Sequence, residues 1–274
     1  MDEGITRIFN KKDFEGLNSH VIGEKIFKYS TVRSTNDLAF IHALKGEKEG
    51  AVFWAQGQTN GRGRLGRSWV SHKNKGLYFS IILKPEITVK DAPRITLMTG
   101  VSLSKALRKF SDKEFLIKWP NDIVIGDRKI GGILTEIDSE IQKIKFVILG
   151  IGINTNMSPG ELPTKEATSL KIETGKEINQ ENLLSVCLKE LDNSYLEFEK
   201  NGFKSILEDA RGLCSLWGRQ VKIEDLTKTD LNPKAAKWHL EGTAVDFDDD
   251  GALIIRQNNG FLKHIFAGDV KLLR

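Results

Sequence analysis

The sequence is poor in cysteine and has no long apolar run. Only two cysteines occur in 274 residues, Cys187 and Cys214, without a C-x-x-C pair or a disulfide framework, so we expect buried structural thiols. The five histidines show no pair at metal-ligand spacing, which argues against zinc and predicts no metal site of the protein's own. No segment approaches the ~18 apolar residues of a membrane span, and the N-terminus lacks the apolar stretch of a secretory signal. These absences predict a cytoplasmic protein with no membrane contact.

The sequence also lacks a strong excess of either basic or acidic residues. The 41 basic and 37 acidic residues leave a net charge of +4, which does not suit a protein that coats nucleic acid. With 39% hydrophobic and 28% charged residues, the composition is that of a globular chain long enough for one large domain, or for one large and one small domain. The arginines are unevenly spread, however, because three of them fall between Arg62 and Arg67.

Apolar periodicity and turn signals predict an α/β segment followed by a β-rich one. The first 24 residues are weakly patterned and predict an arm or a short helix. Strands are expected over 25–30, 50–56, 76–83, 114–119, 122–126, 129–137 and 144–156. Helices are expected over 91–110 and, as two pieces, within 179–210. After Trp217, short alternating strands predict a small β-barrel or sandwich, with a boundary near residue 215.

A further helix is expected in "STNDLAFIHALKGEK", which starts at Ser34. Ser34 can cap the helix, and Asp37 three residues later makes a variant of the capping box. Gly46 is expected to end the helix. Its expected apolar face consists of Leu38, Ile41, Ala43 and Leu44.

The segment "GQTNGRGRLGRSW" (57–69) contains the pattern G-x-G-x-x-G, but it is no dinucleotide loop. That loop needs a helix directly after the glycines and an acidic residue about 20 positions later, and neither is present. Glycines allow close backbone approach, and Arg62, Arg64 and Arg67 offer planar, bidentate donors, so we expect a clamp for phosphate or carboxylate. Because like charges repel and glycine raises the entropy of ordering, the loop should become ordered only over an anion. A solvated basic hairpin is the alternative.

A second constellation lies in "KWPNDIVIGDRKIGGILTE" (118–136). Lys118 is expected at the end of a strand, followed by a Trp-Pro turn. Asn121 and Asp122 then present an amide and a carboxylate, and Lys129 stands at the start of the next strand. Gly131 and Gly132 would let another group pack on the backbone, although a plain β-hairpin explains the turn residues equally well. The third piece, "GIGINTN" (150–156), predicts a turn that either faces a ligand or is simply tight.

Five segments resemble the biotin protein ligase family in order and spacing. They are "STND" (34–37), "GQTNGRGRLGRSW" (57–69), "KWPND" (118–122), "DRKIGGILTE" (127–136) and "GIGINTN" (150–156). The resemblance covers roughly residues 25–274 and implies an α+β fold. After the N-terminal arm (1–24), it implies a catalytic domain on a mixed, class II synthetase-like β-sheet (25–215) and a small C-terminal SH3-like β-barrel (216–274).

The resemblance also implies an activity. Members of this family activate biotin with Mg²⁺-ATP to biotinyl-5′-AMP, then transfer biotin to a lysine of a biotin carboxyl carrier domain. Some members carry a winged-helix domain that binds DNA. Since only about 24 residues precede Lys25, too few for a domain with its own core, we expect no repressor activity and no nucleic-acid partner. Strand edges near 130–150 could pair across a two-fold axis, which leaves a homodimer possible.

Site roles follow from the same resemblance. Lys129, Arg64 and Asp122 are the implied catalytic residues: Lys129 lies near the biotin carboxylate and the α-phosphate, and Asp122 orients the acceptor amine or Mg²⁺. The implied biotin contacts are Ser34, Thr35, Asn36, Gln58, Gly61, Arg62, Lys129, Gly132 and Ile133. The implied ATP and adenylate contacts are Arg62, Arg64, Arg67, Trp69, Lys118, Asn121 and Asn154.

Three other functions compete with this one. Lipoate ligases and octanoyltransferases share the catalytic fold. A nucleic-acid patch would need aromatic stacking residues beside the arginines, and only Trp69 is close. A protein that binds biotin without ligating it would not require Lys129 and the arginine loop, both of which are present.

Overall fold

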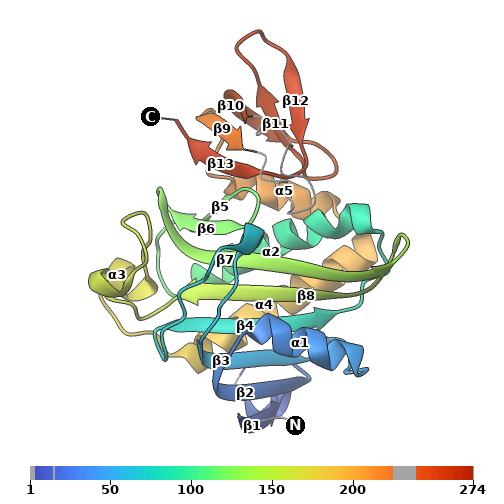
Figure 1. Ribbon diagram of the computed structural model, residues 1–274, viewed down its shortest axis with the longest axis vertical. Coiled ribbons are helices and arrows are strands. Elements are labelled where there is room, and N and C mark those ends of the chain that lie inside the picture. Colours follow the sequence, from blue (N-terminus) through green and yellow to red (C-terminus); the bar gives the residue numbers. More distant parts are fainter. Residues whose placement is uncertain (1–3, 15, 225–238, 274) are drawn as a thin grey trace.

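A mixed sheet of eight strands forms the body of the computed structural model, which describes residues 4–14, 16–224 and 239–273 (Figure 1). The strand order is β1-β2-β3-β4-β8-β7-β6-β5. The strands are β1 (Ile5–Asn10), β2 (Lys25–Val32), β3 (Val52–Gln58), β4 (Gly76–Leu83), β5 (Leu116–Lys118), β6 (Asp122–Ile125), β7 (Arg128–Glu140) and β8 (Lys143–Asn154). Only β2 and β3 run parallel, and all other neighbours are antiparallel. The expected mixed sheet is confirmed.

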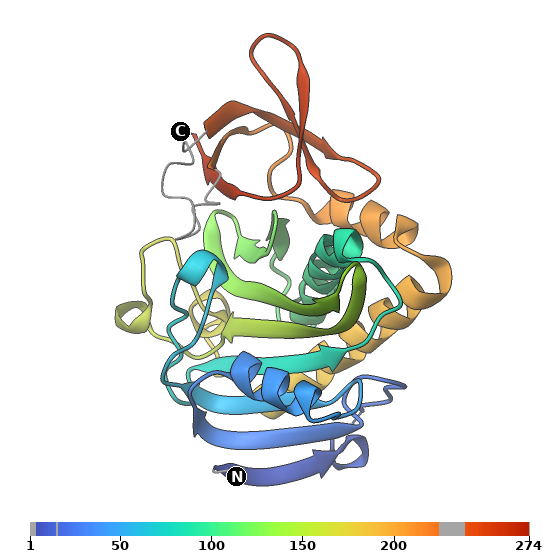
Figure 2. The same cartoon turned by 45° about the vertical axis from the view of Figure 1, so that its right-hand side comes forward.

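Helices cover the two faces of this sheet unequally. Helix α1 (Thr35–Leu44) lies on one face, while α2 (Ala92–Leu107) and α4 (Gln180–Asn201) lie on the other (Figure 2). Helix α5 (Lys204–Leu213) packs against α2 near the C-terminal strands. The short elements are α3 (Leu170–Thr174), η1 (Lys11–Asp13), η2 (Arg64–Gly66), η3 (Val89–Asp91) and η4 (Pro159–Glu161). Because α1 is short, it leaves part of its face of the sheet free for a site.

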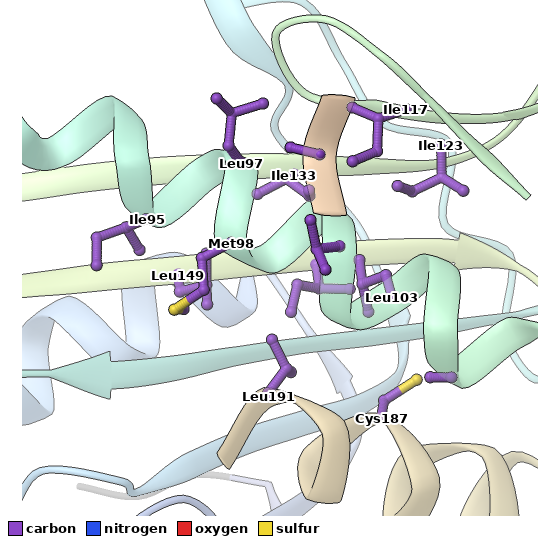
Figure 3. Close-up of a cluster of buried hydrophobic side chains, with 14 of the residues drawn as sticks. Ile95, Leu97, Met98, Leu103, Ile117, Ile123, Ile133, Leu149, Cys187 and Leu191 are labelled. Atoms are coloured by element: carbon purple, nitrogen blue, oxygen red, sulfur yellow. The ribbon is translucent and has the colours of Figure 1, made fainter. Parts of the chain in front are cut away.

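The larger core fills the space between the sheet and the α2–α4 layer. Figure 3 shows its centre, where side chains from α2, α4 and the sheet meet: Ile95, Leu97, Met98, Leu103, Leu149, Cys187 and Leu191. The prediction of buried structural thiols is confirmed, since Cys187 and Cys214 are both buried and free. Burial raises the pKa of the Cys214 thiol to about 12, so this thiol is not a nucleophile at neutral pH.

The C-terminal segment forms a separate antiparallel sheet of five strands in the order β12-β11-β10-β9-β13. These strands are β9 (Gln220–Glu224), β10 (His239–Phe247), β11 (Leu253–Arg256), β12 (Leu262–Ile265) and β13 (Asp269–Leu272). Trp217 packs edge-on against Phe247, and Arg211 of α5 pairs with Asp246 at 2.9 Å, so the sheet is tied to the helical layer. The β-rich ending is confirmed, although the expected strands at 219–226 and from 238 extend partly into residues outside the described ones.

Two local predictions are wrong. The N-terminal residues expected as an arm or short helix form β1. Pairing with β2 supplies their backbone hydrogen bonds, although their own apolar pattern is too weak to predict a strand. In α1 only part of the predicted apolar face is buried: Ala43 and Leu38 pack into a hydrophobic cluster, whereas Ile41 and Leu44 are 46% and 63% exposed. Ser34 occupies the N-cap but makes no capping hydrogen bond through its side chain. The buried first turn of α1 is polar because it faces a cavity.

Candidate active site

A small cavity lies on the sheet face beside the first turn of α1, under the loop that joins β3 to β4. Its volume of about 50 Å³ gives room for a few water molecules only, at roughly 10–15 Å³ each. Eleven predicted site residues line it: Ser34, Thr35, Asn36, Gln58, Arg62, Arg64, Trp69, Asn121, Lys129, Gly132 and Ile133. Five do not: Gly61, Arg67, Lys118, Asp122 and Asn154. Residues as far apart in sequence as Ser34 and Gly152 are therefore brought together, and a larger ligand requires the loop to move.

Glycines form the floor of the cavity. Gly132 of β7 and Gly152 of β8 are direct partners across the two strands. A Cβ atom on Gly152 would lie 2.5 Å from Trp69 Nε1, and one on Gly132 would lie 3.0 Å from the Trp69 ring. A Cβ on Gly150 would lie 2.0 Å from Asn36 Oδ1. The turn predicted for 150–156 is therefore wrong in its first half, because Gly150 and Gly152 belong to β8 and clear space for other side chains.

We expect Gly152→Ala to displace the Trp69 indole, since real Cβ atoms do not approach a neighbour so closely. Activity should fall roughly 10²-fold, as a shift of about 1 Å in a positioned group can cause. Tryptophan fluorescence and ATP–pyrophosphate exchange measure the two effects. The matched control is Gly160→Ala, where a Cβ meets nothing within 4 Å. Wild-type exchange in Gly152→Ala would contradict the role given to this floor.

One end of the cavity is neutral and rich in hydrogen-bonding groups. The Thr35 backbone N–H donates to Gln58 Oε1 at 2.9 Å, and Gln58 Nε2 donates to Ser71 Oγ at 2.9 Å. Ser34, Thr35 and Asn36 are all buried. Buried donors and acceptors without net charge suit a small polar ring that carries both N–H and C=O groups.

Another part of the cavity wall carries the basic side chains Lys129 and Arg64. Lys129 Nζ lies 2.6 Å from Asp122 Oδ1 and 5.2 Å from the Trp69 ring centre. Asp122 thus does not line the cavity but holds the ammonium group that does. Lys118 is the register partner of Asp122 on β5, and the turn between them contains the cis bond Trp119–Pro120. Lys129 stands at the start of β7, as expected.

Asn154 does not line the cavity. Its Nδ2 donates to the Thr168 carbonyl at 3.0 Å, and the Thr168 N–H donates to the Lys129 carbonyl at 2.8 Å. The Lys129 N–H in turn donates to the Glu166 carbonyl at 2.7 Å. Residues 166–168 therefore brace the start of β7, a role that no sequence motif announced.

Two of the three loop arginines are neutralised by carboxylates. Arg62 makes a bidentate pair with Glu136 at 2.8 and 2.7 Å and contacts Asp37 at 2.8 Å. Arg67 pairs with Asp269 of β13, and this hydrogen bond raises the pKa of Arg67. Protein carboxylates thus supply counter-ions to these two arginines, and ordering of the loop over an anion stays a prediction.

Arg64 differs from its two neighbours. Its Nη1 donates to Asn121 Oδ1 at 2.9 Å, and within the described residues it makes no ion pair with a carboxylate. Burial lowers the pKa of the Arg64 guanidinium, against the opposing fields of Asp269 and Asp122, yet an arginine remains charged. A half-buried cation without a counter-ion is costly, so this position favours an anionic ligand.

No metal centre is evident in the part of the chain that the structure describes. It holds no group of three or more His, Cys, Asp or Glu side chains placed to bind a metal ion. The carboxylates nearest the cavity are engaged, Asp122 by Lys129 and Glu136 and Asp37 by Arg62. These residues do not fit a protein-held Mg²⁺. The same residues contain no helix long and apolar enough to cross a bilayer.

The mixed sheet, the glycine-floored cavity with one neutral and one cationic end, and the appended antiparallel sheet define a ligase of the biotin and lipoate class. The profile of the Biotin/lipoate A/B protein ligase family matches residues 28–154, and that of the Biotin protein ligase C terminal domain matches residues 239–273.

Individual relatives narrow the class. The chain is 31% identical to the bifunctional ligase/repressor BirA of Bacillus subtilis over 94% of this chain and 77% of that protein. It is 30% identical to the biotin–[acetyl-CoA-carboxylase] ligase of Mycobacterium tuberculosis, covering 88% and 86%. The biotin protein ligase of Aquifex aeolicus in complex with biotin and ATP superposes with a TM-score of 0.74 at 29% identity, covering 91% and 98%. The chain belongs to the biotin protein ligase family and is a biotin ligase.

Proposed function

We propose that this chain joins biotin to ATP as biotinyl-5′-AMP and passes the biotin to a lysine of a biotin carboxyl carrier domain. One observation carries the proposal: a single cavity has a neutral hydrogen-bonding end at Thr35 and Gln58 and a cationic end at Lys129 and Arg64. That polarity fits a ligand with a ureido ring at one end and a carboxylate at the other. The relatives that act on biotin and the structure that binds biotin and ATP support it.

The chemistry requires such cations. A carboxylate that attacks the α-phosphate of ATP brings two anions together, and negative charge develops on the departing pyrophosphate. Preorganised positive groups stabilise that transition state more than the separated substrates. Lys129, held by Asp122, is the group we assign to the reacting oxygens, and Arg64 is assigned to the phosphate.

The remaining site roles are proposals in the same sense. We assign the ureido ring to Ser34, Thr35 and Gln58, and the acyl chain to the floor around Gly132 and Ile133. Gly61, whose carbonyl accepts from the Trp69 N–H at 2.8 Å, shapes the loop rather than the cavity wall. Further residues assigned to the adenylate side are Trp69, Arg67, Lys118, Asn121 and Asn154. Mg²⁺ enters only as a partner of the nucleotide phosphates.

A second cavity offers a route for the acceptor lysine. It has a volume of about 640 Å³, lies between η3, the start of α2, β7 and the C-terminal sheet, and shares Arg64, Asn121 and Ile133 with the first cavity. The lysine must reach the activated carbonyl through a neighbouring opening, and this groove adjoins the site at the three shared residues. We propose that the carrier segment bearing the lysine lies along it.

Val89, at the rim of this groove and 38% exposed, provides the test. A charged side chain there would oppose apolar contact with the carrier, so Val89→Glu should slow transfer to a carrier domain at least about tenfold. ATP–pyrophosphate exchange, which needs no carrier, should remain at the wild-type rate. Leu44→Glu, at an exposed apolar residue of α1 that does not line this groove, is the control. Unchanged transfer in Val89→Glu would exclude this route.

Other assignments stay predictions. We propose that residues 25–215 and 216–274 act as the catalytic and C-terminal domains, with Arg67–Asp269 as a tie between them. We propose that a homodimer would pair through the part of β7 after Gly132, because β6 pairs with β7 only as far as that residue. Sedimentation equilibrium tests this dimer. The expected absence of repressor activity stays open, because two thirds or more of bifunctional ligase/repressors align with the chain; a mobility-shift assay decides it. The cytoplasmic location is likewise untested.

ATP–pyrophosphate exchange tests the proposed activity. Exchange should depend on biotin and should not be supported or inhibited by lipoate at comparable concentration. Pyrophosphate exchange that does not depend on biotin, or that lipoate supports equally well, would reject the proposal in favour of another carboxylate-activating enzyme.

A further inference from the structure

An unbroken series of side-chain hydrogen bonds joins the neutral end of the cavity to the arginine loop. Thr35 Oγ1 lies 3.2 Å from Gln58 Oε1, and Ser80 Oγ lies 2.8 Å from Thr35 Oγ1. Ser80 Oγ is also 2.6 Å from Asn36 Oδ1. Asn36 Nδ2 donates to Glu136 Oε2 at 2.7 Å.

The series ends on Arg62, through its bidentate pair with Glu136. Ser80 belongs to none of the motifs described above, and Glu136 ends the motif 127–136 without a role of its own. Both stand on strands whose other face is apolar, and Ser80 is fully buried. A buried hydroxyl in the middle of an apolar strand is costly unless it is hydrogen-bonded, and Ser80 meets this need through Thr35 and Asn36.

The direction of these hydrogen bonds follows from Glu136. A carboxylate only accepts, so Asn36 must turn its Nδ2 toward Glu136 and its Oδ1 toward Ser80. The single hydroxyl proton of Ser80 is therefore donated to Asn36 Oδ1. The Thr35 hydroxyl is then a donor toward Ser80 or Gln58. The charge of Glu136 thereby fixes the orientation of the Asn36 amide, directs the Ser80 hydroxyl toward it and leaves Thr35 as a donor.

Arg62 also fixes the shape of the loop. The loop is a closed hairpin, in which the Trp69 N–H donates to the Gly61 carbonyl at 2.8 Å and the Gly63 N–H donates to the Arg67 carbonyl at 2.7 Å. A hairpin clamped at Arg62 therefore keeps Trp69 on its glycine floor. Arg62 already has two anionic partners, because Nη1 donates to Glu136 and Nη2 contacts both Glu136 and Asp37.

We propose that Glu136 is a positioning residue that couples the ligand's ring end to the order of the loop, and that Arg62 is the fixed anchor of that loop rather than a phosphate ligand. The loop then has two parts. Its base at Arg62 stays in place, while Arg64 and its neighbours move to admit and cover the substrates. The coupling to the ligand rests on the proposed function. The anchoring of the loop by Arg62 does not depend on it.

Glu136→Gln tests the anchor, because it keeps the size of the side chain and removes the charge. In substrate-free protein, hydrogen exchange of the backbone amides of 61–69 should accelerate roughly tenfold, the effect of losing one charge-assisted hydrogen bond. The KM for biotin in ATP–pyrophosphate exchange should rise by a similar factor while kcat changes little. Glu140→Gln, on the same strand and paired only with Lys145 in the described contacts, is the matched control and should change neither.

Two further variants separate anchoring from coupling. Arg62→Lys keeps the charge but loses the bidentate geometry, so it should loosen the loop as Glu136→Gln does. Ser80→Ala leaves the Arg62–Glu136 pair intact, so loop exchange in the free protein should match wild type. The extra protection that biotin gives to residues 61–69 should be lost in Ser80→Ala.

The outcomes are distinct. Wild-type loop exchange in both Glu136→Gln and Arg62→Lys would overturn the anchor. Full protection by biotin in Ser80→Ala would overturn the coupling. If the wild-type protein shows no biotin-dependent pyrophosphate exchange, the proposed function fails, yet the loop measurement in substrate-free protein still decides the anchor.

Discussion

Lys129→Ala should reduce adenylate formation by about 10²–10³-fold or more, the effect of removing a preorganised group that stabilises charge in the transition state. Lys129 is held 2.6 Å from Asp122 and lines the cavity at its cationic end. Without it, the approach of a carboxylate to the α-phosphate lacks its nearest positive charge. Biotin-dependent ATP–pyrophosphate exchange measures the loss.

The fold should survive this change, since Lys129 is part-exposed and lies at the start of β7. Circular dichroism and thermal unfolding check this point. Lys145→Ala, at an exposed lysine of the neighbouring strand β8, is the matched control and should keep normal exchange. Near-normal pyrophosphate exchange in Lys129→Ala would refute the assignment.

Arg64→Gly should still form biotinyl-5′-AMP but release it. Arg64 is the loop arginine that no described carboxylate neutralises, and it stands where the two cavities meet. Removing it takes away the cation that we assign to the phosphate and loosens the cover that keeps water from a reactive mixed anhydride. Released adenylate should biotinylate lysines of bystander proteins, which streptavidin blotting detects.

Arg64→Lys separates charge from geometry. The lysine keeps the charge but not the planar fork, so we expect leakage between that of wild type and that of Arg64→Gly. Arg256→Gly, at an exposed arginine of the C-terminal sheet, is a control and should not leak. Bystander labelling by Arg64→Gly at the wild-type level would remove Arg64 from the retention of the adenylate.

Much of the fold could be read from the sequence because long apolar strands and α2 carry strong periodic patterns. The strand predicted over 76–83 coincides with β4, and the helix predicted over 91–110 contains α2. The buried side of helix α1 could not be predicted correctly, because its first turn is buried with polar residues that line the cavity. Thr35 and Asn36 are buried there, whereas Leu44 is exposed.

The candidate site was predictable wherever residues cluster in a motif. Gln58, Arg64, Lys129 and Gly132 were expected and do line one cavity. Single residues on separate strands were not predictable, because their importance depends on which strands become neighbours. Ser80 is of this kind, and so is Asp269, which reaches the loop from the end of the chain, while Glu136 stands in the motif 127–136 but received no role from it.

The most direct test of the central claim is a retention measurement. The protein is incubated with ATP and labelled biotin, passed through a desalting column and then mixed with a carrier domain in the absence of ATP. We predict that about one biotinyl-5′-AMP per active site co-elutes with the protein and is transferred to a single carrier lysine. Protein that elutes without adenylate, or that retains adenylate and cannot transfer the biotin, would contradict the account.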